Sequence, residues 1–115
     1  MTQMNGYHIL ADLWGCEPAY LEQESKLREV LLEAAEHGGL HPIGECFHQF
    51  NPRGLTGVIL LELSHISAHS WPELDFIGID IYSCGGKSKA KKAMDYILSV
   101  LKPKRFEIRE MERFR

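Results

Sequence analysis

The chain has 115 residues, of which 44% are hydrophobic and 25% charged, and its formal net charge is -3 at pH 7. These values predict one soluble globular domain over residues 1–115, large enough for an ordinary core without disulfide or metal staples. The sequence contains no apolar run near the ~20 residues of a membrane span and no leader-like start, so we expect a cytoplasmic protein that binds no membrane.

The first third of the sequence predicts a strand followed by a helix. Residues 6–14 are rich in large apolar side chains and end at Gly15, which indicates a strand. Pro18 suits the first turn of a helix, and apolar residues then recur at helical spacing until Gly38-Gly39. The positions predicted to face the core are Leu27, Val30, Leu31, Ala34 and Ala35.

The middle of the sequence predicts four antiparallel strands joined by turns. Residues 51–54 and 72–75 have turn composition and separate the apolar stretches. Those stretches cover residues 43–50, 55–63, 66–71 and 76–82. Two of them, 55–63 and 76–82, are apolar at nearly every position, which indicates burial on both sides of the sheet.

A second helix and a final strand complete the pattern. Apolar positions from Ala90 to Leu101 share one helical face, Pro103 ends the helix, and residues 104–109 alternate as a strand. The order β-α-β-β-β-β-α-β predicts an α+β two-layer sandwich, an antiparallel β-sheet covered on one face by two α-helices. Because two helices cover only one face, we expect a homodimer that covers the other by sheet stacking.

Charged residues are unevenly distributed along the chain. Residues 1–63 hold nine acidic and three basic residues, and residues 64–115 hold seven acidic and ten basic residues. Such asymmetry is compatible with a basic nucleic-acid surface or with two segments that attract each other. The overall charge is negative and no nucleic-acid motif is present, so the lysines at positions 87–92 more simply form a solvated face, and we expect no nucleic-acid partner.

Reactive side chains concentrate between Ser64 and Glu73. On a strand His65 and His69 would share one face. From the residues alone, three interpretations remain open: a polar strand end, a metal pair made by the two histidines, and a nucleophilic site in which a histidine activates a serine. No third ligand lies at a characteristic spacing, so no metal site is predicted.

The cysteines are three in number: Cys16, Cys46 and Cys84. They form no C-x-x-C pair and their count is odd, which argues against a disulfide framework and against a zinc knuckle. The pattern remains compatible with one functional thiol.

Several ordered motifs resemble the short prokaryotic S-adenosylmethionine decarboxylase proenzymes. They are SHISAHSWPE at 64–73, FHQFNPRGLTG at 47–57, IDIYSCG at 79–85 and YHILADLWGC at 7–16. The resemblance implies autocatalytic cleavage at Leu63/Ser64 into a beta chain, residues 1–63, and an alpha chain, residues 64–115. Ser64 would become a covalent pyruvoyl group that decarboxylates S-adenosylmethionine through a Schiff base, providing the aminopropyl donor for spermidine biosynthesis.

The resemblance also implies catalytic roles for four residues. Ser64 would form the pyruvoyl group, so that no diffusible cofactor is needed. His69 would transfer a proton during processing, and Thr56, where the family usually has serine, would support that step. Cys84 would return a proton to the decarboxylated carbon.

Substrate binding is implied at two further positions, and one position departs from the family. Phe50 would stack on the adenine, and Glu73 would hold the ribose hydroxyls. The family pattern places Glu where this chain has Leu63. Because a one-residue step reverses the face of a strand, we expect that the neighbouring Glu62 does not simply replace that carboxylate.

The departure at Leu63 leaves two alternative functions. The chain could be a pyruvoyl-dependent decarboxylase of arginine or ornithine, although Phe50 and Glu73 suit an adenosyl substrate better. It could also be an unprocessed, non-catalytic paralogue that acts as a regulatory subunit. The intact set of Ser64, His69 and Cys84 argues against that alternative.

Overall fold

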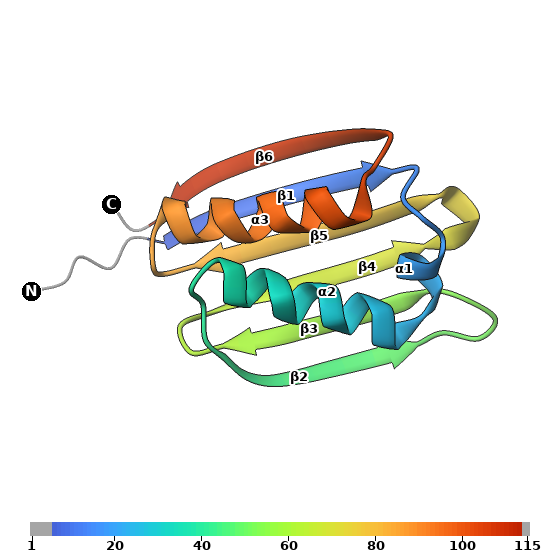
Figure 1. Cartoon of the computed structure of the whole chain (residues 1–115), viewed down its shortest axis with the longest axis horizontal. Coiled ribbons are helices and arrows are strands. Elements are labelled where there is room, and N and C mark those ends of the chain that lie inside the picture. The colour runs from blue at the N-terminus through green and yellow to red at the C-terminus, as the bar shows by residue number, and fades with distance from the viewer. Residues whose placement is uncertain (1–5, 114–115) are drawn as a thin grey trace, which may run out of the picture.

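The computed structural model describes residues 6–113. Along the chain, its elements are β1 (Gly6–Trp14), α1 (Ala19–Glu22), α2 (Glu24–His37), β2 (Pro42–Gln49), β3 (Leu55–Leu61), β4 (Ser64–Trp71), the short 3-10 helix η1 (Pro72–Leu74), β5 (Phe76–Ser83), α3 (Lys87–Leu101) and β6 (Arg105–Arg113). The strands form one antiparallel sheet in the order β2-β3-β4-β5-β1-β6. Helices α2 and α3 lie side by side on one face of it (Figure 1), which confirms the predicted α+β sandwich.

The core fills the layer between the helices and that face of the sheet. Alternate residues of the four inner strands β1, β3, β4 and β5 point into it, as in β1, where Ile9, Ala11 and Leu13 are buried. All five predicted core positions of α2 are buried, and α3 contributes Ala90 through Leu101 on its inner side. Burying one large aliphatic side chain contributes about 1.5–3 kcal/mol, so this layer supplies most of the stability that positions the site.

Two predicted element boundaries were wrong. The predicted first helix is divided at Gln23, whose extended backbone ends α1. The Leu21 carbonyl of α1 accepts a hydrogen bond at 2.7 Å from the hydroxyl of Ser70, a residue of β4. The strands predicted over residues 55–63 and 66–71 are joined by a two-residue turn, Glu62-Leu63. β3 therefore ends at Leu61, and β4 begins at Ser64. Leu63, one of its two residues, continues the apolar pattern of β3, which is why periodicity did not locate the turn.

The other face of the sheet is left uncovered by this chain between residues 6 and 113. It carries large apolar side chains that are 41–60% exposed, namely Leu10, Leu60, Trp71 and Met111. Exposed apolar area of this kind is typical of an interaction surface. The homodimer that would cover this face stays a prediction.

The cleavage predicted at Leu63/Ser64 would divide the sheet between two interleaved segments. β1, β2 and β3 belong to residues 1–63, and β4, β5 and β6 belong to residues 64–115. In the sheet, the pairings β3-β4, β5-β1 and β1-β6 join the two segments. Backbone hydrogen bonds and the shared core would therefore hold the two segments together. The opposite net charges of the segments would contribute little, because exposed ion pairs such as Arg109 and Asp12 are screened by solvent.

Within residues 6–113, neither α2 nor α3 combines the length and apolar character that a membrane-spanning helix requires.

Candidate active site

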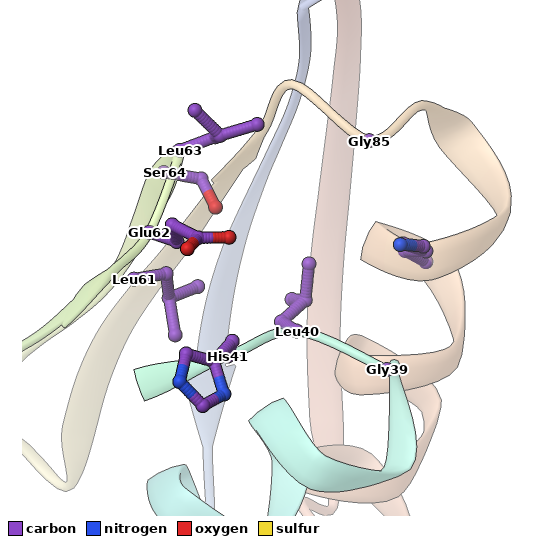
Figure 2. A pocket seen from close by; sticks show the side chains of 9 residues that line it. Gly39, Leu40, His41, Leu61, Glu62, Leu63, Ser64 and Gly85 are labelled. Carbon is purple, nitrogen blue, oxygen red and sulfur yellow. The ribbon is translucent and has the colours of Figure 1, made fainter. Parts of the chain in front are cut away.

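Ser64 lies at the first position of β4, directly after the turn. Leu61 and Ser64 pair across it, and the Glu62 N–H donates to the His41 carbonyl at 2.9 Å, which fastens the turn to the segment before β2. The Ser64 hydroxyl points into a cavity of about 90 Å³ (Figure 2). The other residues that line this cavity are Gly39, Leu40, His41, Leu61, Glu62, Leu63, Gly85 and Lys89.

The turn changes the expected relation between Glu62 and Leu63. We expected that Glu62 would not stand in for a carboxylate at position 63, because successive residues of a strand face opposite ways. In the turn, the Glu62 carboxylate and the Ser64 hydroxyl point to the same side, while the Leu63 side chain points away (Figure 2) and is 56% exposed. The cavity beside Ser64 therefore does contain a carboxylate, supplied from one residue earlier.

Cys84 is the cysteine that the topology places at the Ser64 end of the sheet. β4 and β5 are neighbours with His65 opposite Tyr82, so the residue after β5 lies at the end where β4 begins. Burial and a hydrogen bond with the Cys84 thiol raise the pKa of Tyr82. Cys16 lies beyond the far end of β1, and burial raises the pKa of its thiol to about 11, which keeps it protonated and unreactive.

A second cavity, of about 340 Å³, lies at the other end of the β3–β4 hairpin. Thr56 and His69 face each other across these strands, with 3.3 Å between the Thr56 Oγ1 and His69 Nδ1 atoms. Phe50 and Glu73 line the same cavity. Its volume falls in the range typical of small-molecule sites, on the order of 300–1,000 Å³. The structure thus brings four of the predicted site residues into one cavity.

The loop that carries Phe50 is held by a glycine and a buried serine. The Phe50 N–H donates to the Gly54 carbonyl at 2.8 Å. Gly54 has φ +110, a strained conformation for other residues, and a Cβ there would lie 3.2 Å from the Ser70 carbonyl. The Ser70 hydroxyl in turn accepts the Leu55 N–H at 2.8 Å. Ser70 is therefore a structural residue, and the half-exposed Phe50 ring packs edge to face against His48 and lines the cavity.

The two groups of predicted site residues do not meet within one chain. Along the hairpin, the pair Leu61–Ser64 and the pair Thr56–His69 are five residues apart, about 17 Å at the rise of a strand. We call the Ser64 end, with Cys84, the serine half-site. The other end, with Phe50, Thr56, His69 and Glu73, is the histidine half-site.

A polar cluster on the uncovered face was missed by the sequence analysis. His65 shares this face with His69, as expected, but the two histidines contact different partners: His65 lies 3.0 Å from Asp80, whereas His69 contacts Thr56. His8 lies 2.8 Å from the same Asp80 oxygen. A charged residue between Ile79 and Ile81 in an apolar strand was the signal that could have indicated this cluster.

Two of the four lysines at the start of α3, Lys87 and Lys91, have partners within the chain. Lys91 Nζ lies 3.8 Å from Glu110 Oε2, and Lys87 Nζ lies 5.9 Å from the centre of the Tyr7 ring. Lys89 lines the Ser64 cavity. These contacts give the basic segment a local explanation.

Comparisons with known proteins agree with the fold. The family model described as S-adenosylmethionine decarboxylase matches residues 7–114. The S-adenosylmethionine decarboxylase proenzyme of Persephonella marina is 52% identical over 98% of this chain and 85% of its own, and that of Aquifex aeolicus is 44% identical over 98% and 84%. The crystal structure of the adenosylmethionine decarboxylase from Aquifex aeolicus covers 96% of this chain and 91% of its own, with 43% identity and a TM-score of 0.88. The chain belongs to the S-adenosylmethionine decarboxylase family.

Proposed function

We propose that this chain is a proenzyme that cleaves itself between Leu63 and Ser64, forms a pyruvoyl group from Ser64 and decarboxylates S-adenosylmethionine, supplying the aminopropyl donor for spermidine synthesis. One observation carries the proposal. In this chain, which belongs to the family, Ser64 directly follows the tight turn, and its hydroxyl faces a cavity next to the Leu63–Ser64 peptide bond that it would attack. The names of the relatives, all proenzymes of this activity, favour it over an arginine or ornithine decarboxylase and over an uncleaved regulatory subunit.

The bonds that form and break in the cleavage belong to Leu63, Ser64 and water. The Ser64 Oγ attacks the Leu63 carbonyl carbon, and an ester C–O bond forms as the C–N bond between the two residues breaks. Removal of the Ser64 α-proton then breaks the Cβ–Oγ bond, which releases Leu63 as a carboxylate. Hydrolysis of the remaining dehydro residue releases ammonia and leaves the ketone. A pyruvoyl ketone supplies an electron sink for the decarboxylation of an amine-bearing substrate.

Glu62 is the residue that we expect to assist the first step. Its carboxylate lines the cavity into which the Ser64 hydroxyl points, and a carboxylate there can accept the hydroxyl proton as the oxygen attacks. Replacing Glu62 with Gln keeps the size of the side chain and removes this base. We expect self-cleavage to slow by about 100-fold, measured as the loss of full-length chain over time on denaturing gels.

The matched control for this variant is Glu29→Gln, which makes the same chemical change elsewhere. Glu29 lies on the exposed side of α2 and lines neither cavity, so this variant should cleave at the wild-type rate. Equal cleavage rates for Glu62→Gln and the wild type would show that the carboxylate has no part in processing.

The separation of the two half-sites indicates that two copies complete each active site. The Ser64 cavity of about 90 Å³ is smaller than a typical small-molecule site, whereas the histidine half-site has that size. A two-fold contact is self-complementary, so a dimer in which the uncovered sheet faces stack can bring the Ser64 end of one β3–β4 hairpin next to the histidine half-site of the other. The exposed Leu10, Leu60 and Trp71 on this face would be buried in such a dimer.

Intact-mass analysis of the purified protein tests the proposed function. We expect two fragments that meet at Leu63/Ser64, the C-terminal fragment blocked at its amino terminus by the pyruvoyl group. Release of carbon dioxide should then be measured from S-adenosylmethionine, arginine and ornithine. A single uncleaved mass under all conditions contradicts the enzyme proposal, and release from the amino acids alone contradicts the substrate.

A further inference from the structure

Three side chains from three adjacent strands converge on the uncovered face of the sheet. His8 lies on β1, His65 on β4 and Asp80 on β5, and β5 runs between the other two. The Nε2 atoms of His8 and His65 lie 2.8 and 3.0 Å from the same oxygen, Asp80 Oδ2. The three candidate ligand atoms all lie within 4.8 Å of one another.

The surroundings hold this cluster in place. The Ser67 hydroxyl donates to Asp80 Oδ1, which orients the carboxylate and leaves Oδ2 directed at the histidines. The Tyr82 ring packs against both imidazoles, with ring centres 5.4 Å from His8 and 6.0 Å from His65. In the single chain the side chains of His8, Asp80 and His65 are 21%, 23% and 36% exposed, so an ion can reach them before two copies stack on this face.

The orientation of the carboxylate also suits a cation. The Asp80 carboxylate and the two imidazole nitrogens would be the metal ligands, and the Ser67 hydroxyl would be the supporting group that orients the carboxylate.

We propose that His8, His65 and Asp80 bind one divalent transition-metal ion, for which Zn²⁺ is the best match. Two imidazole nitrogens and one carboxylate oxygen form a common zinc ligand set, with metal–ligand distances of about 2.0–2.2 Å and a fourth position left for water. In a tetrahedral site with those distances the ligand atoms lie roughly 3.3 Å from one another. The nitrogen–oxygen distances of 2.8 and 3.0 Å therefore need to lengthen only slightly to admit the ion.

The metal would join the two segments of the cleaved chain. His8 belongs to residues 1–63, whereas His65 and Asp80 belong to residues 64–115. An ion held by both would link β1 to β4 and β5 after the covalent connection at Leu63/Ser64 is lost. Binding itself does not depend on cleavage, so it can be measured on cleaved and uncleaved protein alike.

Isothermal titration of the full chain with ZnCl₂ at pH 7.5, after dialysis against a chelator, tests the proposal. We expect one equivalent bound per chain and an increased Tm, both in the wild type and in the Ser64→Ala variant, which keeps the test independent of the proposed function. Asp80→Asn, which preserves the shape of the side chain, and His8→Ala should each abolish this stoichiometric binding. Ser67→Ala should weaken it by about tenfold or more, as expected for a residue that supports a ligand.

His37→Ala is the control variant. His37 stacks on Tyr96 on the helical side of the molecule and should bind Zn²⁺ as the wild type does. Visible absorption of the wild type loaded with Co²⁺ provides a second measurement that needs no variant, since tetrahedral nitrogen–oxygen coordination gives intense bands. Absence of saturable one-to-one Zn²⁺ binding, absence of those bands, or undiminished binding by the folded Asp80→Asn variant would overturn the proposal.

Discussion

Replacing Ser64 with Ala should leave the chain as one polypeptide of 13.2 kDa and reduce carbon dioxide release from S-adenosylmethionine to the uncatalysed background. Alanine has no hydroxyl to attack the Leu63 carbonyl, so no ester, no cleavage and no ketone can form. Ser64 is only half-buried at the end of its strand, and the side-chain hydrogen bonds described for the hairpin do not involve it. The variant should therefore fold as the wild-type precursor does, which circular dichroism and the Tm can verify.

Ser99→Ala is the control for this variant. Ser99 lies on the exposed side of α3, and its hydroxyl donates to the Tyr96 carbonyl within the same helix. Cleavage and activity should be unchanged in it. Substantial activity in a Ser64→Ala chain that remains uncleaved would refute the pyruvoyl mechanism for this protein, whatever masses the wild type shows.

The fold was predictable because its elements have strong local patterns. The buried stripe of α2 and the alternation along β1 appear in the sequence as apolar residues at helical and strand spacing, and each becomes a face of one core. The tight turn at Glu62-Leu63 did not appear, because its apolar residue continues the pattern of the strand before it. At the break near Gln23, the Leu21 carbonyl bonds to Ser70, 49 residues further along the chain, and a local pattern does not reveal such a partner.

The candidate site was only partly predictable for a related reason. Motifs and the family resemblance identified residues such as Ser64 and His69, but spacing along one hairpin does not show whether two side chains meet. Their separation follows from the register of β3 and β4, and a partner copy is not encoded in any local pattern. The cluster at Asp80 requires the order of β4, β5 and β1 in the sheet, which brings together residues from distant parts of the sequence.

A heterodimer of the Ser64→Ala chain with the His69→Ala chain should recover activity that neither homodimer has. If each active site takes Ser64 from one protomer and His69 from the other, one of the two sites in the heterodimer retains both residues. Co-expressed with different affinity tags and purified through both, the heterodimer should show about half the activity of the wild-type dimer. Its His69→Ala chain should be cleaved at Leu63/Ser64, although the same chain stays intact in its own homodimer.

The reciprocal arrangement distinguishes this model from a site within one protomer. A chain that carries both substitutions, paired with a wild-type chain, leaves Ser64 and His69 intact in the same protomer. If the two residues act across the interface, each site then lacks one of them, and the dimer should be inactive. If they act within one chain, this dimer should retain about half of the activity and the first heterodimer none. The separation of about 17 Å along one hairpin favours the cross-protomer outcome, since a proton transfer requires contact at hydrogen-bond distance.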